Sequence, residues 1–420
     1  MRVRVAGAGT TSRVLATLLV SAVLLTLGAA PAYADSIRNR EYWLSEYRIS
    51  EAWAVTKGAG VTIAIIDTGV DGSHLDLTGA VVGGADFSGQ GSANGQTPVG
   101  TSNNHATMVA SLAAGRGHGS GAGILGAAPE ASILSLSIGF DAAGVDSDQQ
   151  IADAVRWAAD HDADIINMSL TRNTLDWPES WDDAFLYAME KDVVIIAAAG
   201  NRGSGTSVVG APATMPGVLT VAGVDRNGSA SFDASSQGIT IGVSAPSEEL
   251  VGATPGNGYV LWDGTSGASP IVAGVAALVR AAHPELSATD VINRIVSTAR
   301  PAGAAGVDPI YGYGLMDAAA AVSATVPHVT ANPMGSLADW IVLYRRADAP
   351  ALPAPTAAAI PAPDSSPIAA DDGVTGTLLP SIAQLRDVGI PLLVFAVFLV
   401  TFLLLVRSAV RHARGVRQTE

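Results

Sequence analysis

Short runs of aliphatic and β-branched residues alternate with longer segments of helical periodicity along most of this 420-residue chain. This alternation is typical of an α/β domain with a largely parallel sheet, because each parallel strand must be followed by a crossover connection. The runs that we interpret as buried strands are residues 61–67, 131–138, 164–170, 193–200 and 218–224. Residues 146–162 and 180–192 keep apolar side chains on one face, as crossover helices do. Two further helices are predicted at residues 269–283 and 287–299.

Residues suited to nucleophilic catalysis stand beside these elements. Asp67 ends the first predicted strand, and His105 and Ser266 each lead into a helix-like run. A serine hydroxyl becomes nucleophilic when an imidazole takes its proton, and the imidazole needs a carboxylate to fix its tautomer. Asn201 follows a strand end, so its amide and the Ser266 backbone N–H are suited to hold an oxyanion. Because ligands bind at the carboxyl ends of parallel strands, we expect these residues at one rim.

Taken singly, two of these residues have simpler interpretations. Ser266 also suits a helix cap after Gly264-Thr265, and Asn201 suits a turn after Gly200. Turn and cap chemistry does not explain why four such residues occur in this order, so the sequence favours the catalytic interpretation.

The strings around these residues resemble those of the subtilisin family of serine peptidases, the subtilases. They are DTGV from Asp67, an H-x-T context at His105, AAGN ending at Asn201, and GTS-x-ASP around Ser266. The order Asp, His, Ser is also that of the subtilisin type. The resemblance covers residues 42–322 and implies a seven-stranded parallel sheet flanked by helices, hydrolysis of peptide bonds, and the roles proposed above for the four residues.

The resemblance further implies that two segments line the substrate cleft, the first of which pairs with the substrate backbone as an added strand. These segments are Ser169, Leu170 and Thr171, and Ala198, Ala199 and Gly200.

Three neighbours of these residues depart from the family pattern without removing a catalytic atom. Ala106 stands where H-G-T-H has glycine, Gly267 where S-M-A has methionine, and Thr171 where S-L-G has glycine. Ala106 adds a methyl beside the base, and Gly267 weakens the helix start by about 0.5–1 kcal/mol relative to alanine. Thr171 places a branched side chain at the first specificity pocket. We expect a restricted preference at the cleavage site.

The two ends of the chain carry targeting signals. Residues 1–34 combine early arginines, an apolar stretch and the ending Ala-Tyr-Ala, which predicts a secretory signal. Residues 388–406 contain 19 residues without a charge, about 28 Å as a helix and close to the thickness of a bilayer core. This segment is predicted to be a single transmembrane helix. The arginine-rich tail 407–420 is then cytoplasmic by the positive-inside rule, and the domain lies outside the cytoplasm at the plasma membrane.

The remaining segments complete the expected organisation. Residues 35–50 form an N-terminal extension, because the 32 residues between Asp35 and Asp67 are too few for a folded inhibitory prodomain. Residues 51–325 form the peptidase domain. Residues 326–387 connect it to the membrane, ending in a Pro/Ala-rich stalk.

This layout is similar to that of the mycosins, the membrane-anchored subtilases of type VII secretion systems. The resemblance implies a protein or peptide substrate and association with a type VII secretion complex. Two alternatives remain open: a structural subunit of a secretion complex with dispensable catalysis, and a protease that processes leader peptides.

Composition limits the other partners. The formal charge is −15 for the whole chain and −21 for residues 35–406, which argues against nucleic acid as a partner. The absence of cysteine excludes a thiol nucleophile and a cysteine zinc site. No acidic or histidine cluster has metal-ligand spacing. We therefore predict no metal site from the sequence and no required cofactor. Calcium is common in subtilases, so a structural calcium ion stays an open alternative that the sequence does not reveal.

Overall fold

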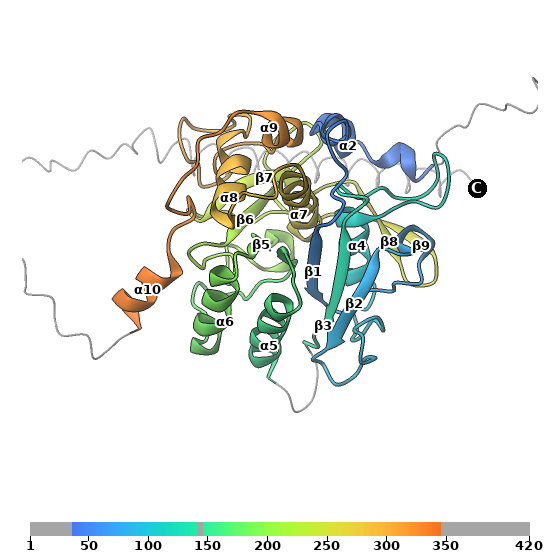
Figure 1. Cartoon of the computed structure of the whole chain (residues 1–420), viewed down its shortest axis with the longest axis horizontal. Helices are drawn as coiled ribbons and strands as arrows, with labels where there is room; N and C mark the ends of the chain where they lie inside the picture. The colour runs from blue at the N-terminus through green and yellow to red at the C-terminus, as the bar shows by residue number, and fades with distance from the viewer. Residues whose placement is uncertain (1–35, 141–145, 346–420) are drawn as a thin grey trace, which may run out of the picture. The chain divides into compact units, whose positions relative to one another are not determined.

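The computed structural model describes residues 36–140 and 146–345, and a seven-stranded parallel sheet lies at its centre (Figure 1). The strands lie in the order β2-β3-β1-β4-β5-β6-β7. Their bounds are β1 (Thr62–Asp67), β2 (Val81–Asp86), β3 (Ser132–Ser137), β4 (Ile165–Met168), β5 (Val194–Ala198), β6 (Leu219–Val224) and β7 (Ile241–Pro246). Because all neighbours are parallel, the carboxyl ends of β1, β4 and β5 lie at one edge of the sheet.

Helices and one hairpin surround the sheet. The α-helices are α2 (Trp43–Glu46), α3 (Ile49–Ala52), α4 (His105–Ala114), α5 (Ser147–Asp160), α6 (Glu179–Glu190), α7 (Thr265–Ala282), α8 (Ala288–Ser297), α9 (Ala318–Ser323) and α10 (Leu337–Tyr344). The 3₁₀ helices are η1 (Arg38–Arg40), η2 (Leu75–Leu77) and η3 (Arg202–Ser204). An antiparallel hairpin of β8 (Leu250–Thr254) and β9 (Gly258–Trp262) precedes α7 and lies beside α4 (Figure 1).

All strands of the sheet except β2 bury both faces, which explains their continuous apolar runs. Successive side chains of a strand point to opposite faces. Ile63 and Ile65 of β1 pack in the core that contains α4, α7 and α8, whereas Ala64 and Ile66 pack in the core that contains α5 and α6. Figure 1 shows α5 and α6 together, away from α7 and α8. The α/β class and the seven-stranded sheet are therefore confirmed.

Periodicity identified the central strands but not the edges of the sheet. The five predicted runs correspond to β1, β3, β4, β5 and β6, whereas β2, β7 and the hairpin were not predicted. β2 is partly exposed and contains Gly83 and Gly84. A side chain at Gly84 would collide with the carbonyl oxygen of Ser135 on β3, so close approach of the strands requires glycine here and removes the apolar signal.

The N-terminal extension is packed onto the domain. Trp43 and Ile49 are fully buried. The Tyr42 hydroxyl donates to the Glu248 carbonyl oxygen at 2.7 Å. Arg48 forms an ion pair with Asp317 at 2.9 Å, at the residue that caps α9. The described part of this extension thus belongs to the same folded unit as the sheet.

Packing also continues beyond residue 325, where the sequence placed the end of the compact domain. Leu337 of α10 is buried, and the ring of Trp340 lies 4.3 Å from that of Trp177. Arg345 forms an ion pair with Asp182 of α6 at 2.9 Å. Residues 326–345 are therefore folded against the domain, and the Pro/Ala-rich composition begins only after them.

The signal segment 1–34, the predicted transmembrane helix 388–406 and the tail 407–420 lie outside the described residues. Within residues 36–140 and 146–345, only α7 is both long and apolar enough to cross a membrane. Most of α7 is buried in the domain core, which accounts for its composition.

Replacement of Trp43 tests whether the extension is part of the cooperative fold. Trp43→Ala should lower the free energy of unfolding by about 3–5 kcal/mol, because it removes a large, fully buried side chain. Urea unfolding followed by circular dichroism measures this. Trp157→Ala on α5, where the indole is half-buried, is the matched control and should cost about 1 kcal/mol or less. Equal effects would contradict the assignment.

Candidate active site

Asp67 and His105 form a hydrogen-bonded pair at the carboxyl edge of the sheet. Asp67 is the last residue of β1, and His105 is the first residue of α4. The His105 Nδ1 atom lies 2.9 Å from Oδ1 and 2.8 Å from Oδ2 of Asp67. The Asp67 side chain is 3% exposed and the His105 side chain 26% exposed. The buried carboxylate therefore fixes one edge of an imidazole that solvent and substrate can reach.

The carboxylate also sets the basicity of this imidazole. Burial by itself lowers the pKa of His105, but the charge of Asp67 and its hydrogen bond act in the opposite direction. The net result is a pKa above that of a free histidine. His105 is thus a stronger base than an isolated imidazole.

Ser266 stands in the first turn of α7, and its position depends on Pro270. A proline has no N–H, so the Ser266 carbonyl oxygen lacks its usual helical donor from four residues on. The Ser169 hydroxyl supplies that donor at 2.9 Å. The Ser266 hydroxyl in turn donates to the Ser169 carbonyl oxygen at 3.3 Å. This exchange holds the start of α7 against the segment that follows β4.

Asn167, at the end of β4, extends this connection. Its Nδ2 donates to Ser169 Oγ at 3.1 Å, and its Oδ1 accepts from Ser269 Oγ at 2.7 Å. All three side chains are buried. The first turn of α7 is therefore attached to β4 at two points.

The orientation of the Asn201 amide follows from its hydrogen bonds. Its Oδ1 accepts from the Thr265 backbone N–H at 2.8 Å and from the Thr265 hydroxyl at 2.9 Å. Two donors identify this atom as the oxygen, so Nδ2 is the free end that can donate elsewhere. Gly264 has a φ of 145° and no side chain; a Cβ there would lie 3.0 Å from Nδ2. Asn201 is also among the residues that line an open hollow of about 340 Å³.

The two segments expected to line a cleft both adjoin Ser266. Ser169 contacts Ser266 directly, and the Gly200 N–H donates to the Thr265 hydroxyl at 3.1 Å. Ala198 ends β5, and Ala199 is buried behind Gly200. Leu170 is buried, whereas Thr171 is half-buried. The structure thus brings the sequence-predicted site residues to one edge of the sheet.

Sequence reasoning missed Gly210, which faces Thr171. A Cβ at Gly210 would lie 2.8 Å from Thr171 Oγ1 and would collide with the Arg172 carbonyl oxygen. The Arg172 N–H donates to the Ala211 carbonyl oxygen at 2.7 Å, which joins the two segments. The space next to Thr171 is therefore narrow. The only sequence signal was a glycine before the Ala211-Pro212 turn.

Sequence reasoning also missed the role of Thr265, whose backbone N–H and hydroxyl both donate to Asn201 and orient its amide.

The sequence analysis treated Gly267 only as a residue that weakens the start of a helix. In the structure, a Cβ at Gly267 would collide with Leu250 and would lie 3.2 Å from Trp262. A side chain at position 267 would therefore need Leu250 of the β8–β9 hairpin to move.

The loop after α4 carries carbonyl oxygens of the kind that bind cations. Those of Ala122 and Gly123 accept from the Arg38 guanidinium at 3.0 and 2.9 Å. Within the described residues, no three His, Cys, Asp or Glu side chains are arranged to hold a metal ion. The Arg38 guanidinium that binds this loop is also ion-paired with the buried Glu41 at 2.7 Å.

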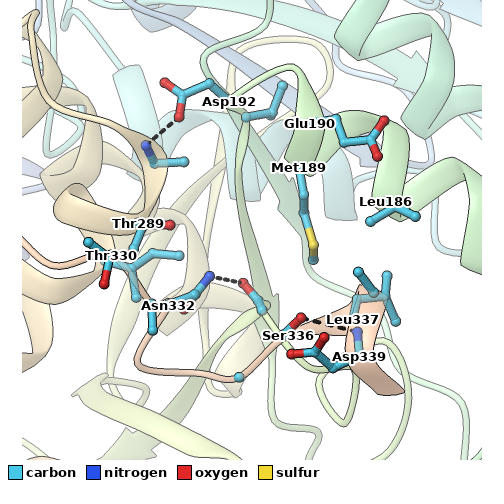
Figure 2. Close-up of a pocket in the computed structure, with 17 residues that line it drawn as sticks. Leu186, Met189, Glu190, Asp192, Thr289, Thr330, Asn332, Ser336, Leu337 and Asp339 are labelled. Carbon is cyan, nitrogen blue, oxygen red and sulfur yellow. Dashed lines mark hydrogen bonds between the residues drawn. The ribbon is translucent and has the colours of Figure 1, made fainter. Parts of the chain in front are cut away.

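A separate cavity of about 600 Å³ lies between α6, α8 and residues 330–339 (Figure 2). Its lining includes Met189, Asp192 and Asn332, and Asn332 donates to the Gly217 carbonyl oxygen. None of the site residues described above lines it. This cavity adjoins the segment leading to α10 and is distinct from the Asp67–His105 site.

Comparison with known proteins agrees with this geometry. The subtilase family model of peptidase S8 matches residues 58–314. Subtilisin DY from Bacillus licheniformis is 38% identical over 272 residues, which is 63% of this chain and 92% of that protein.

Solved structures of mycosins are similar as well. MycP1 from Mycobacterium smegmatis is 31% identical with a TM-score of 0.60, covering 73% of this chain and 89% of that one. MycP1 from the ESX-1 type VII secretion system is 32% identical with a TM-score of 0.61, covering 73% and 91%. The chain therefore belongs to the subtilase family and is a subtilisin-like serine protease structurally close to the mycosins.

Proposed function

We propose that this protein is a membrane-anchored serine endopeptidase that cleaves exported proteins outside the cytoplasm. The observation that carries the catalytic part is the Asp67–His105 hydrogen bond beside the first turn of α7, which bears a half-buried serine. Asp67, His105 and Ser266 have the roles of orienting carboxylate, base and nucleophile. The mechanism uses protein groups only.

In the proposed first step, the Ser266 hydroxyl leaves its long contact with the Ser169 carbonyl oxygen and turns toward His105. Its oxygen attacks the carbonyl carbon of the scissile bond while His105 Nε2 takes the proton. Asp67 accepts the Nδ1–H hydrogen bond and stabilises the imidazolium. His105 then gives the proton to the leaving amine, and water hydrolyses the resulting acyl-enzyme by the same route.

The negative charge that develops on the carbonyl oxygen is held by two donors. One is Asn201 Nδ2, the amide end left free by Thr265, and the other is the Ser266 backbone N–H. Because Asn201 Oδ1 is held by two hydrogen bonds, its amide is oriented before the reaction and needs no reorganisation.

Substrate binds along Ser169, Leu170 and Thr171 as an added strand, with Ala198, Ala199 and Gly200 on the other side of the cleft. The narrow space between Thr171 and Gly210 supports selection of a small side chain next to the cleaved bond. The protein is thus proposed to be a restricted protease.

The anchoring part of the proposal comes from segments outside the described residues. Residues 1–34 are a secretory signal, the stalk ends at residue 387, residues 388–406 span the plasma membrane once, and residues 407–420 are cytoplasmic. The likeness to MycP1, described as coming from the ESX-1 type VII secretion system, supports a place beside such a system.

Substitution of the nucleophile and the oxyanion donor tests the catalytic roles in the full chain. Ser266→Ala should abolish peptide hydrolysis and labelling by a fluorophosphonate, because it removes the proposed nucleophile. Asn201→Ala should lower kcat by about 100- to 1000-fold, as is typical for one lost oxyanion donor. Steady-state kinetics and gel labelling measure both.

The matched controls are Ser297→Ala and Asn227→Ala, at exposed positions outside the site. Both should behave as wild type. Labelling of Ser266→Ala at the wild-type rate would contradict the proposal. In cells, exported proteins that stay uncleaved with Ser266→Ala identify substrates, whereas secretion that needs the chain but tolerates Ser266→Ala would favour the structural-subunit alternative.

The raised pKa of His105 predicts a specific pH dependence. The base must be neutral, so kcat/KM should fall as pH decreases through that pKa, with a midpoint above about 6.5, the value of a free histidine. Asp67→Asn removes the cause of the upward shift and should lower both the midpoint and the rate, the rate by about 10⁴-fold. His328→Gln, at an exposed histidine, should change neither. An activity unchanged down to about pH 4 would contradict His105 as base.

The absence of cysteine makes the topology directly testable. Ser297→Cys places a thiol on the exposed surface of the domain, and Ser408→Cys places one in the tail. A membrane-impermeant maleimide on intact cells should label the first and spare the second. Deletion of residues 388–406 should release the domain from the membrane fraction. Labelling of both sites, or retention of the deletion variant, would contradict the proposed anchoring.

A further inference from the structure

Trp262 lies against the His105 ring on the hairpin that leads to Ser266. The two ring centroids are 5.9 Å apart with planes at 76°, an edge-to-face contact. This distance lies within the range that aromatic pairs prefer. Trp262 is the last residue of β9 and stands four residues before Ser266. One short segment therefore carries both the nucleophile and a ring that contacts the base.

The indole of Trp262 packs against glycines on two different elements, where a side chain would crowd the ring. A Cβ at Gly252 of β8 would lie 2.8 Å from Trp262 Nε1, and a Cβ at Gly267 of α7 would lie 3.2 Å from its Cζ2. In the hairpin, Trp262 pairs with Leu250, which is buried on the same face. Position 267 has methionine in the usual family pattern. In this chain it is glycine, which leaves space for the side chains of Leu250 and Trp262 of the hairpin.

The Nε1 atom of the indole also bears on what determines the position of the Trp262 ring. Trp262 Nε1 is buried and has no hydrogen-bond partner among the described residues. An unpaired buried donor costs folding free energy. A hydrogen bond within the described residues therefore does not explain the position of this ring, whereas its packing against the core and its contact with His105 do.

Asp67 alone leaves the imidazole incompletely fixed. It holds one edge of the ring through Nδ1 but does not prevent the ring from tilting about that bond. The indole of Trp262, whose ring centroid lies 5.9 Å from that of His105, restricts that tilt.

We propose that Trp262 is a positioning residue that holds the His105 imidazole in line with Ser266. This inference rests on the proposed catalytic role of His105. It assigns to the β8–β9 hairpin a direct effect on the chemical step.

The test compares Trp262→Ala and Trp262→Phe in the full chain, purified in detergent and assayed with a peptide substrate. Rates are expressed per active site labelled by a fluorophosphonate, so that an unfolded fraction does not lower them. Trp262→Ala should lower kcat about tenfold and leave KM within about twofold, whereas Trp262→Phe should stay within about threefold of wild type. Where the alanine variant does not fold, Trp262→Leu keeps the bulk without the aromatic ring and should show the same loss.

Trp157→Ala is the matched control, because it removes the indole of another Trp–His contact, the stacked pair of Trp157 on α5 with His161, which follows that helix. It should leave kcat and KM unchanged. A normal kcat per site in Trp262→Ala, a loss confined to KM, or a Trp262→Phe variant as slow as Trp262→Ala would each overturn the inference. Ser266→Ala separates the failure of the proposed function from the failure of the inference about Trp262. If this variant remains active, the proposed function is wrong, regardless of the results for the Trp262 variants.

Discussion

The attachment of the first turn of α7 to the ends of β4 and β5 is the interaction on which the site depends. Pro270 leaves the Ser266 carbonyl oxygen without a helical donor, and Ser169 at the end of β4 supplies one. Thr265 binds the Asn201 side chain and the Gly200 N–H after β5. These are hydrogen bonds between buried or half-buried groups, so shifting α7 by one residue would leave several of them unpaired. The position of the nucleophile is thus determined by the strands that carry the oxyanion donor and the substrate segment.

The parallel sheet makes this attachment possible. Neighbouring parallel strands end at the same edge, and β1, β4 and β5 are consecutive in the sheet. Asp67, Ser169 and Asn201 are far apart in the sequence but become neighbours because each follows or ends one of these strands. Helices α4 and α7 pack on one face and bring His105 and Ser266 to that edge from the side.

This explains how much the sequence could predict. The four proposed catalytic residues could be predicted because each lies in a short string of family-like residues. Two of them, Asp67 and Asn201, also lie at the ends of strands. The four residues are Asp67, His105, Asn201 and Ser266. The central strands could be predicted because burial on both faces keeps them apolar. β2 could not, since Gly84 is required by the close approach of Ser135, and glycine gives no hydrophobic signal. Gly210 and Thr265 act through contacts with residues distant in the sequence, which no local pattern encodes.

The three departures from the family pattern have different physical meanings in the structure. Ala106 is fully buried beside His105, so its methyl fills space in the core of the domain. Thr171 faces Gly210 and narrows the binding segment, which bears on substrate choice. Gly267 admits Leu250 and Trp262 of the hairpin. A methionine there would force the side chain of Leu250 to move and would crowd the indole beside His105. Gly267 and Trp262 therefore form one packing arrangement. Replacing either residue alone is not expected to be neutral, because the other residue stays in place.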